Sequence, residues 1–219
     1  MLVSGGLDSV VALADAAREG PVAPLYIRSG LVWESAEMYW LERFLQTIGA
    51  PPLVVLDLPV ADLYGAHWSL VGDDPPGSDS PDEAVYLPGR NLLLLSKAGV
   101  WAAENGCEAI VIGPLAANPF PDSTRAFFDA MGEAIGLAMG LGDPLPVQMP
   151  LSGLTKAEVI RRGAGLPLEL TFSCLNPTAD YRHCGACNKC AERRKGFAAA
   201  GVADPTAYAY GSRADAGST

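Results

Sequence analysis

The chain has 219 residues, of which 49% are hydrophobic, so it can bury a sizeable core as one domain with a small appendage. Asp and Glu number 25 against 15 Lys and Arg, which gives a formal net charge of −10. Polynucleotides are bound mainly through clustered Lys and Arg. The acidic balance therefore argues against a nucleic-acid partner, but it permits a small phosphorylated ligand that one loop can hold.

The chain contains no apolar run of the length that a membrane span requires. It does not open with a basic segment followed by an apolar stretch, as a secretory signal would. We therefore expect a cytoplasmic protein without a membrane partner. In that reducing compartment, the five cysteines indicate metal binding or free thiols rather than disulfides.

In chain order, short apolar strand patterns alternate with longer amphipathic helix patterns. The predicted strands are at residues 1–3, 22–27, 52–58 and 109–112, and the predicted helices are at 9–18, 34–48, 91–104, 123–139, 155–162 and from 190 to about 200. This order predicts an α/β fold, with a mainly parallel sheet and helices on both of its faces. The first strand is short for the centre of a sheet. Ligands of such sheets bind beyond the carboxyl ends of the strands.

Two helices carry informative local patterns. In the helix at 34–48, Leu41 lies among the apolar residues that repeat at helical spacing, and Glu37 falls on the opposite, polar side. At the start of a later helix, Thr155 followed by Glu158 predicts a capping box.

One helix carries a regular repeat of glycines. Gly132, Gly136 and Gly140 recur every four residues. This spacing favours a small-residue stripe packed on the sheet over a close helix contact between subunits. Residues 59–89 form a long irregular segment rich in Asp, Pro, Gly and Ser, and segments of this length are usually functional or mobile.

A glycine-rich loop lies between the first predicted strand and the first helix. It consists of Ser4, Gly5, Gly6, Leu7, Asp8 and Ser9. Its glycines permit positive φ and keep Cβ atoms out of the path of a phosphate, and the helix N-terminus directs backbone N–H groups at the anion. Asp8 alone would repel a phosphate, so it indicates a divalent cation between them. The Walker and dinucleotide-binding glycine motifs are absent.

Four cysteines near the C-terminus have the spacing of a metal site. They are Cys174, Cys184, Cys187 and Cys190. Four thiolates fill a tetrahedral zinc shell and leave no open position, so we expect a structural zinc site, with an iron–sulfur cluster as the chemical alternative. Cys107 stands alone and is expected in the core. His183 is expected to pack or hydrogen-bond beside the site.

The glycine-rich loop resembles the signature of the PP-loop ATP pyrophosphatases. Together with the cysteine spacing and the stretches at 86–91, 121–122, 154–159 and 170–174, the chain is similar to the 7-cyano-7-deazaguanine synthase family over most of its length. The resemblance implies an adenine nucleotide alpha hydrolase-like fold. It divides the chain into a PP-loop domain at 1–170, a zinc-binding segment at 171–205 and a flexible tail at 206–219.

The resemblance also implies a reaction. That family is an ATP-dependent carbon–nitrogen ligase family that condenses 7-carboxy-7-deazaguanine with ammonia. The carboxylate is adenylated, ammonia attacks to form an amide, and a second activation dehydrates the amide to a nitrile. The implied cofactors are zinc and ATP with magnesium, and the implied assembly is a homodimer.

Roles for individual residues follow from the matching stretches. Asp8, Arg90 and Lys156 are expected to be catalytic, since cations at this edge of the sheet can stabilise charge on phosphorus or on leaving pyrophosphate. Gly113, at the end of the fourth predicted strand, joins the loop as an ATP-binding residue. The expected substrate-binding residues are Gly30, Arg90, Asn91 and Asp122. Asn91 has a helix cap as its alternative role.

The chain departs from the family pattern at two places. The family usually carries Tyr-Gly-Gln-Arg-His where residues 29–33 read Ser-Gly-Leu-Val-Trp, and Cys-Arg-Pro-Glu-Phe where residues 123–127 read Ser-Thr-Arg-Ala-Phe. The alternative function is therefore a PP-loop paralogue that adenylates another carboxylate or small substrate. A tRNA thiolase is disfavoured, because only Cys107 remains outside the cysteine group and the chain is acidic. The intact loop argues against a non-catalytic binding module.

Overall fold

The computed structural model describes residues 1–116 and 118–210. Its α-helices are α1 (Leu7–Glu19), α2 (Glu34–Thr47), α3 (Ala61–Tyr64), α4 (Trp68–Val71), α5 (Arg90–Glu104), α6 (Arg125–Met139), α7 (Lys156–Arg162) and α8 (Asn188–Ala200). Its strands are β1 (Leu25–Arg28), β2 (Val54–Asp57), β3 (Ile110–Val111) and β4 (Val147–Gln148), and its 3-10 helices are η1 (Asp82–Val85), η2 (Pro121–Ser123) and η3 (Leu168–Leu170). Each predicted helix has a counterpart. No helix in the described ranges is long and apolar enough to cross a membrane.

The strands form two parallel pairs that the N-terminal residues link. β1 pairs with β2, and β3 pairs with β4. Between the pairs, the Leu2 N–H donates to the Val111 carbonyl at 2.9 Å, and the Leu25 N–H donates to the Met1 carbonyl at 2.8 Å. The short predicted first strand therefore lies at the centre of the array.

β4 is missing from the sequence-based prediction. Its apolar run is short and follows Pro144 and Pro146, so no period of two can be recognised. Its place is set by tertiary hydrogen bonds. The Ile110 N–H donates to the Pro146 carbonyl at 2.8 Å, and the Ile112 N–H donates to the Gln148 carbonyl at 2.9 Å.

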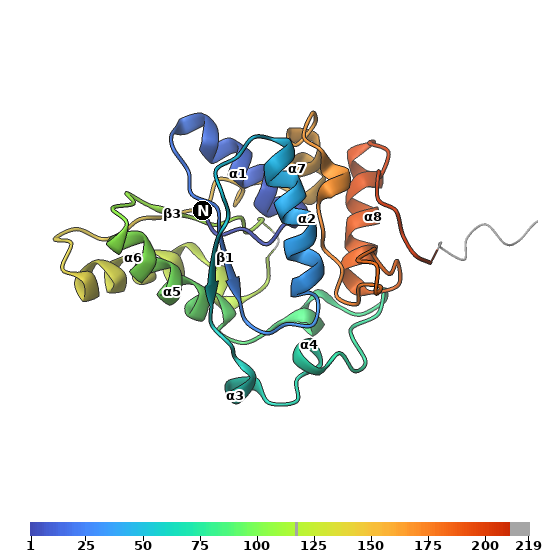
Figure 1. The fold of residues 1–219 in the computed structure, drawn as a ribbon, viewed down its shortest axis with the longest axis horizontal. Coiled ribbons are helices and arrows are strands. Elements are labelled where there is room, and N and C mark those ends of the chain that lie inside the picture. Colours follow the sequence, from blue (N-terminus) through green and yellow to red (C-terminus); the bar gives the residue numbers. More distant parts are fainter. Residues whose placement is uncertain (117, 211–219) are drawn as a thin grey trace, which may run out of the picture.

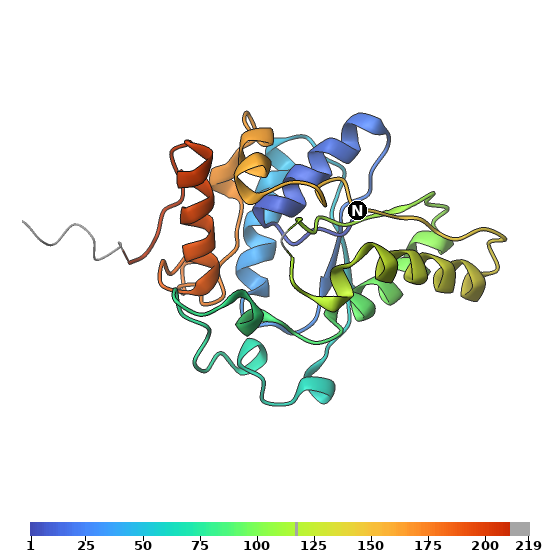
Figure 2. The ribbon, with the colours of Figure 1, turned by 180° about the vertical axis from the view of Figure 1, so that it is seen from behind.

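Successive side chains of β1 point to opposite faces and enter different cores. Leu25 and Ile27 pack with residues of α5 and α6, including Leu95, Phe128 and Ile135. Tyr26 packs with residues of α1, α2 and α7, including Val10, Leu41, Phe44 and Val159. Figure 1 shows α5 and α6 on one side of β1 and α1, α2 and α7 on the other, and Figure 2 shows the same arrangement from behind. The predicted α/β fold with helices on both faces is confirmed.

Two of the three regularly spaced glycines of α6 pack against backbone. A Cβ at Gly132 would lie 2.6 Å from the Leu145 carbonyl oxygen, and one at Gly136 would lie 2.6 Å from the Asp143 carbonyl oxygen. The stripe thus packs on the segment that leads into β4. Gly140 instead ends α6 in a left-handed conformation.

Gly132→Ala should lower the free energy of unfolding by about 1–2 kcal/mol, because overpacking against fixed backbone outweighs the better helix propensity of alanine. Urea denaturation measures the change. Gly153→Ala is the matched control, since no atom lies within 4 Å of its added Cβ. Equal stability of the Gly132 variant and the wild-type protein would contradict this account of the packing.

The long segment at 59–89 contains α3, α4 and η1 and is attached to the cysteine-bearing part of the chain. The Asn188 N–H donates to the Pro76 carbonyl at 2.9 Å, and its side-chain amide donates to the Ser80 carbonyl at 2.8 Å. Since Asn188 directly follows Cys187, the position of the segment depends on the geometry of the cysteine group.

Arg193 of α8 joins three parts of the C-terminal region. Its side chain is 1% exposed. It donates to Thr206 Oγ1 at 2.5 Å, to Thr171 Oγ1 at 2.8 Å and to the Leu168 carbonyl at 3.0 Å. A buried guanidinium needs such partners, because an unpaired buried charge costs several kcal/mol.

The chain remains packed beyond the expected end of the zinc-binding segment. The Ala209 N–H donates to the His183 carbonyl at 2.8 Å, and the Tyr210 N–H donates to the Cys184 carbonyl at 3.1 Å. These contacts extend the packed segment into the tail expected at 206–219. Residues 211–219 of that tail lie outside the described residues.

The capping box predicted at the start of α7 is confirmed. Thr155 Oγ1 accepts the Glu158 N–H at 3.3 Å, and a carboxylate oxygen of Glu158 accepts the Thr155 N–H at 2.8 Å. The cap fixes the beginning of α7, and therefore the position of Lys156, its first residue.

Candidate active site and metal centre

The glycine-rich loop turns tightly into α1. Gly5 has a φ of +77°, and a Cβ there would lie 3.2 Å from Leu41 Cβ, so a side chain at this position would be strained and crowded. The Ser4 N–H donates to Ser9 Oγ at 3.2 Å and holds the turn closed. No side chain in the described ranges caps the start of α1 at Gly6. The first N–H groups of this helix therefore remain available to an anion.

Two cavities meet at the loop. Their volumes are about 240 Å³ and about 320 Å³. Ser4, Asp8, Glu37 and Arg90 line both, so these side chains mark the junction. Because the junction lies between two cavities, ligands bound in both would meet there.

The larger cavity extends along the carboxyl ends of the central strands. It is lined by Ser9, Tyr26, Ile27, Asn91, Leu94, Ile112 and Gly113, among others. The smaller cavity extends toward the cysteine-bearing segment. It is lined by Trp33, Phe120, Lys156, Phe172, Ser173, Lys189 and Glu192, among others. One cavity is thus continuous with the phosphate-type loop and the strand ends, and the other combines aromatic rings with cations.

Lys156 connects the loop with α8. Its Nζ lies 2.6 Å from Asp8 Oδ2 and 2.9 Å from Glu192 Oε1, and Lys189 Nζ lies 2.6 Å from Glu192 Oε2. Burial alone would lower the pKa of Lys156, but the two carboxylates outweigh it and raise that pKa. Burial likewise opposes ionisation of Glu192, yet the two lysines hold its pKa at about 2. Lys156 and Glu192 are therefore both charged at neutral pH.

Arg90 and Asn91 begin α5 at the junction. The Asn91 N–H donates to Asp122 Oδ2 at 2.9 Å, and the Asn91 side chain donates to the Asp122 carbonyl at 2.9 Å. Asp122 thereby holds the start of α5 and lies outside the lining of both cavities. Arg90 Nε is buried and has no hydrogen-bond partner among the described residues. The residue lines both cavities, so its charge lies beside the place where a ligand anion would bind.

Gly30 is not brought to either cavity. It is exposed, has a φ of +86°, and its N–H donates to Glu34 Oε2 at 3.0 Å. Its conformation serves the turn before α2. Gly30 was expected to bind substrate, but it does not line either of the two cavities.

Glu37 was predicted on the polar side of its helix, but this prediction is wrong. The side chain is 8% exposed and lies at the junction of the two cavities. Helical spacing places Glu37 on the buried face of α2, because it stands four residues before Leu41 and seven before Phe44. The spacing does not reveal that the first turns of this face meet a cavity. Glu192, Lys189 and Trp33 were also missed, since only tertiary packing brings them to the loop.

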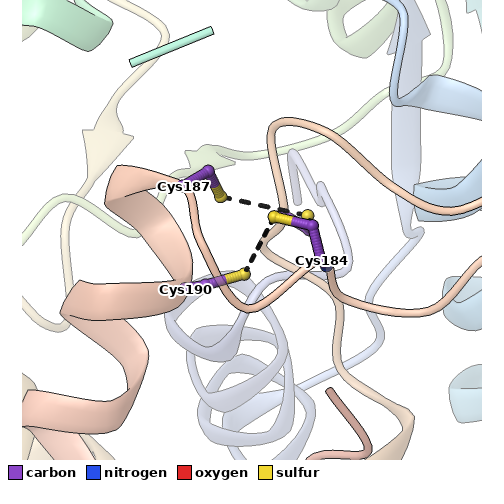
Figure 3. A group of neighbouring side chains, drawn as sticks. Cys184, Cys187 and Cys190 are labelled. Atoms are coloured by element: carbon purple, nitrogen blue, oxygen red, sulfur yellow. Dashed lines mark hydrogen bonds between the residues drawn. The ribbon is translucent and has the colours of Figure 1, made fainter. Parts of the chain in front are cut away.

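The four cysteines converge, and their sulfur atoms lie within 4.8 Å of one another. Cys174 Sγ lies 3.9 Å from Cys187 Sγ, and Cys184 Sγ lies 4.0 Å from Cys190 Sγ. Figure 3 shows Cys184, Cys187 and Cys190 with their sulfur atoms turned toward one another. All four residues are buried. The group could hold a metal ion, as its spacing predicts.

Backbone N–H groups surround the sulfur atoms. The Cys184 N–H donates to Cys174 Sγ at 3.2 Å, and the Ala186 N–H donates to Cys184 Sγ at 3.3 Å. Such donors stabilise negatively charged thiolates, the form that binds metal. The donor set therefore suits a metal ion better than four neutral thiols.

His183 lies next to the cysteine group and accepts a hydrogen bond from the backbone. The Ser173 N–H donates to His183 Nε2 at 3.2 Å, and the imidazole packs against the ring of Phe172 at 4.5 Å between centroids. The expected packing and hydrogen-bonding role is confirmed. Cys107 lies apart from this group and packs against the core beneath α5 and α6.

Comparison with known proteins places the chain in a family. The model of the family described as "Queuosine biosynthesis protein QueC" matches residues 1–201. Relatives named 7-cyano-7-deazaguanine synthase from Azoarcus sp. (strain BH72) and Thiobacillus denitrificans are each 35% identical, over 95% of this chain and 95% and 97% of their own lengths. One from Methanothermobacter thermautotrophicus is 32% identical over 94% of this chain and 97% of its own.

A solved structure with some likeness is the U34-tRNA thiolase NcsA from Methanococcus maripaludis with its 4Fe-4S cluster. It is 14% identical, with a TM-score of 0.47 over 83% of this chain and 61% of its own.

The fold and the site define an α/β protein with a glycine-rich loop at the carboxyl ends of parallel strands and a separate four-cysteine group. More narrowly, the chain belongs to the family of queuosine biosynthesis proteins described as QueC.

Cys187→Ser should reduce the metal content of the purified protein and its stability together, with a loss on the order of several kcal/mol, because binding and folding of such a segment are coupled. Metal analysis and thermal denaturation measure the two effects. Cys107→Ser is the control. Full metal occupancy in the Cys187 variant would exclude this residue as a ligand.

Proposed function

We propose that this chain is an ATP-dependent carbon–nitrogen ligase that converts 7-carboxy-7-deazaguanine and ammonia to 7-cyano-7-deazaguanine. The relatives named 7-cyano-7-deazaguanine synthase, which match along nearly the whole chain, support this proposal. The observation that carries it is the pair of cavities that meet at Ser4, Asp8, Glu37 and Arg90. A reaction between a nucleotide and a second small molecule needs two such adjoining sites.

The larger cavity is the proposed ATP site. Ser4 and the N-terminus of α1 would hold the phosphates where the two cavities meet, with Gly6 lining the smaller cavity beside them. Ser9, Asn91 and Gly113 line the remainder of the larger cavity. Asp8 Oδ1 is buried and has no partner among the described residues, which fits a carboxylate that awaits a cation. Asp8 would therefore hold magnesium, which neutralises phosphate charge when bound.

The smaller cavity is the proposed acceptor site. Trp33 and Phe120 offer aromatic rings to a planar heterocycle, and Lys156 and Lys189 offer charge for its carboxylate. Stacking and ion pairing together would bring the carboxylate to the junction with ATP.

The chemistry divides into activation and nitrogen transfer. A carboxylate oxygen attacks the α-phosphorus and pyrophosphate leaves, and the nitrogen of ammonia then attacks the acyl carbon and AMP leaves. Activation of the resulting amide oxygen by a second ATP permits its loss and yields the nitrile. Arg90 and Lys156 stabilise the negative charge that develops on the phosphorus oxygens.

The four-cysteine group is the proposed structural zinc site. Zinc–sulfur bonds of about 2.3 Å in a tetrahedron place sulfur atoms about 3.8 Å apart. The distances of 3.9 Å and 4.0 Å fit this spacing. Four protein ligands leave no position for substrate, so the zinc would hold the 171–205 segment against the PP-loop domain at 1–170. A cytoplasmic homodimer is the assembly proposed.

The alternative is a paralogue that adenylates another carboxylate. One observation favours it. Trp33, which stands where the family usually has histidine, lines the acceptor cavity and stacks on Trp68 at 5.6 Å between ring centroids. The change therefore affects the shape of the acceptor site directly.

Release of pyrophosphate and AMP from ATP and magnesium, with ammonia, tests the assignment. Release that depends on 7-carboxy-7-deazaguanine, with a nitrile product by mass, is the expected result. No dependence in folded, zinc-loaded protein would contradict the proposed substrate and support the paralogue.

Asp8→Ala should lower turnover by about 100-fold or more, because the variant lacks the carboxylate proposed to hold magnesium. The zinc content should stay unchanged, since Asp8 lies outside the cysteine group. Steady-state kinetics and metal analysis measure the two quantities. Retained activity would contradict the role given to Asp8.

A further inference from the structure

Glu37 presents a buried carboxyl group at the place where the two cavities meet. It is 8% exposed and lines both cavities. Its backbone lies close to the phosphate-type loop, because a Cβ added at Gly5 would lie 3.3 Å from the Glu37 carbonyl oxygen. A group in this position can reach atoms that pass between an adenylate and an acceptor.

Tyr26 orients this carboxyl group. The Tyr26 hydroxyl donates to Glu37 Oε2 at 2.7 Å, within the buried core. That hydrogen bond uses one carboxyl oxygen and leaves Oε1 available to a ligand. A reactive group held by a rigid strand residue needs little reorganisation when the reaction begins.

The charged and titratable groups around Glu37 come from several elements. Tyr26 of β1, Arg90 of α5 and Glu34 of α2 act on it, and Asp8 of α1 and Lys156 of α7 line the cavity beside it. Burial raises the pKa of Glu37 to about 7, although Tyr26 and Arg90 oppose the rise. The group can therefore exchange a proton near neutral pH, where a general base is most effective.

The other carboxyl groups near Glu37 are engaged by lysines or by backbone N–H groups. Asp8 lies 2.6 Å from Lys156, and Glu192 contacts both Lys156 and Lys189. The pKa of Glu192 is held at about 2, which makes it a weak base. Glu34 accepts the N–H groups of Ser29 and Gly30 at the turn before α2. Glu37 is the carboxyl group at the junction without a lysine or arginine ion pair in the described residues.

We propose that Glu37 is the general base that takes a proton from ammonia as its nitrogen attacks the acyl adenylate. This rests on the proposed function. The nitrogen lone pair forms the C–N bond, one N–H proton passes to Glu37 Oε1, and the C–O bond to AMP breaks with its electron pair on AMP. The products are the amide, AMP and the protonated Glu37, which returns its proton to solvent.

Glu37→Gln tests this role, because glutamine keeps the shape and can still accept the Tyr26 hydrogen bond but cannot take a proton. Adenylation needs no proton removal from nitrogen. Carboxylate-dependent exchange of labelled pyrophosphate into ATP, without ammonia, should therefore stay within about threefold of wild type, while amide formation falls by about 100-fold or more. Glu42→Gln, on the exposed side of the same helix, is the matched control.

The pH profile gives a second, independent readout. At a fixed concentration of un-ionised ammonia, the wild-type rate of amide formation should fall as pH drops below about 7, because Glu37 becomes protonated. Glu37→Gln should lack this limb. Tyr26→Phe should move it to higher pH, since the lost hydrogen bond no longer favours the ionised carboxylate.

The outcomes separate the two proposals. Wild-type protein without any carboxylate-dependent exchange would overturn the proposed function and this role with it. Normal wild-type exchange and amide formation, together with a Glu37→Gln variant that loses both equally or neither, would overturn only the role of Glu37. The role of Glu37 would also be overturned if the acid limb of the pH profile persisted in Glu37→Gln and did not shift in Tyr26→Phe.

Discussion

The ion pair between Asp8 and Lys156 is the contact on which the rest of the site depends. It joins the first helix to α7 across 148 residues of chain, with 2.6 Å between the charged atoms. Glu192 extends the pair to α8, and the Phe172 N–H donates to the Gly5 carbonyl at 2.8 Å. The smaller cavity beside the loop therefore forms only when the C-terminal half is in place, because Lys156, Phe172 and Glu192 supply part of its lining, whereas the larger cavity is lined by residues up to Ser123.

The cysteine group controls how that C-terminal half is held. The consecutive residues Phe172, Ser173 and Cys174 line the smaller cavity, and Cys174 is also one of the four grouped cysteines. Asn188 ties the long 59–89 segment to the same place through two hydrogen bonds. A structural metal would therefore hold Phe172–Cys174 and the segment that carries Val85, all of which line the smaller cavity.

Charge is distributed unequally across the site. Lysines neutralise Asp8 and Glu192, whereas Glu37 relies on a tyrosine hydroxyl and the nearby Arg90. Asp8 and Glu192 therefore suit the positioning of cations and phosphates, whereas Glu37 suits proton exchange. Different environments thus give three carboxyl groups different chemistry within one pair of cavities.

The sequence by itself determined the α/β fold class, the family, the glycine-rich loop and the four-cysteine group, because alternating periodicity and ligand spacing are local patterns. It did not place β4, whose short apolar run is positioned by pairing with β3. Nor did it reveal that two cavities meet at Glu37, or that Gly30 and Asp122 lie outside the cavities. Only the tertiary structure decided these points, because they depend on which distant segments pack together, and helical or strand periodicity carries no record of that.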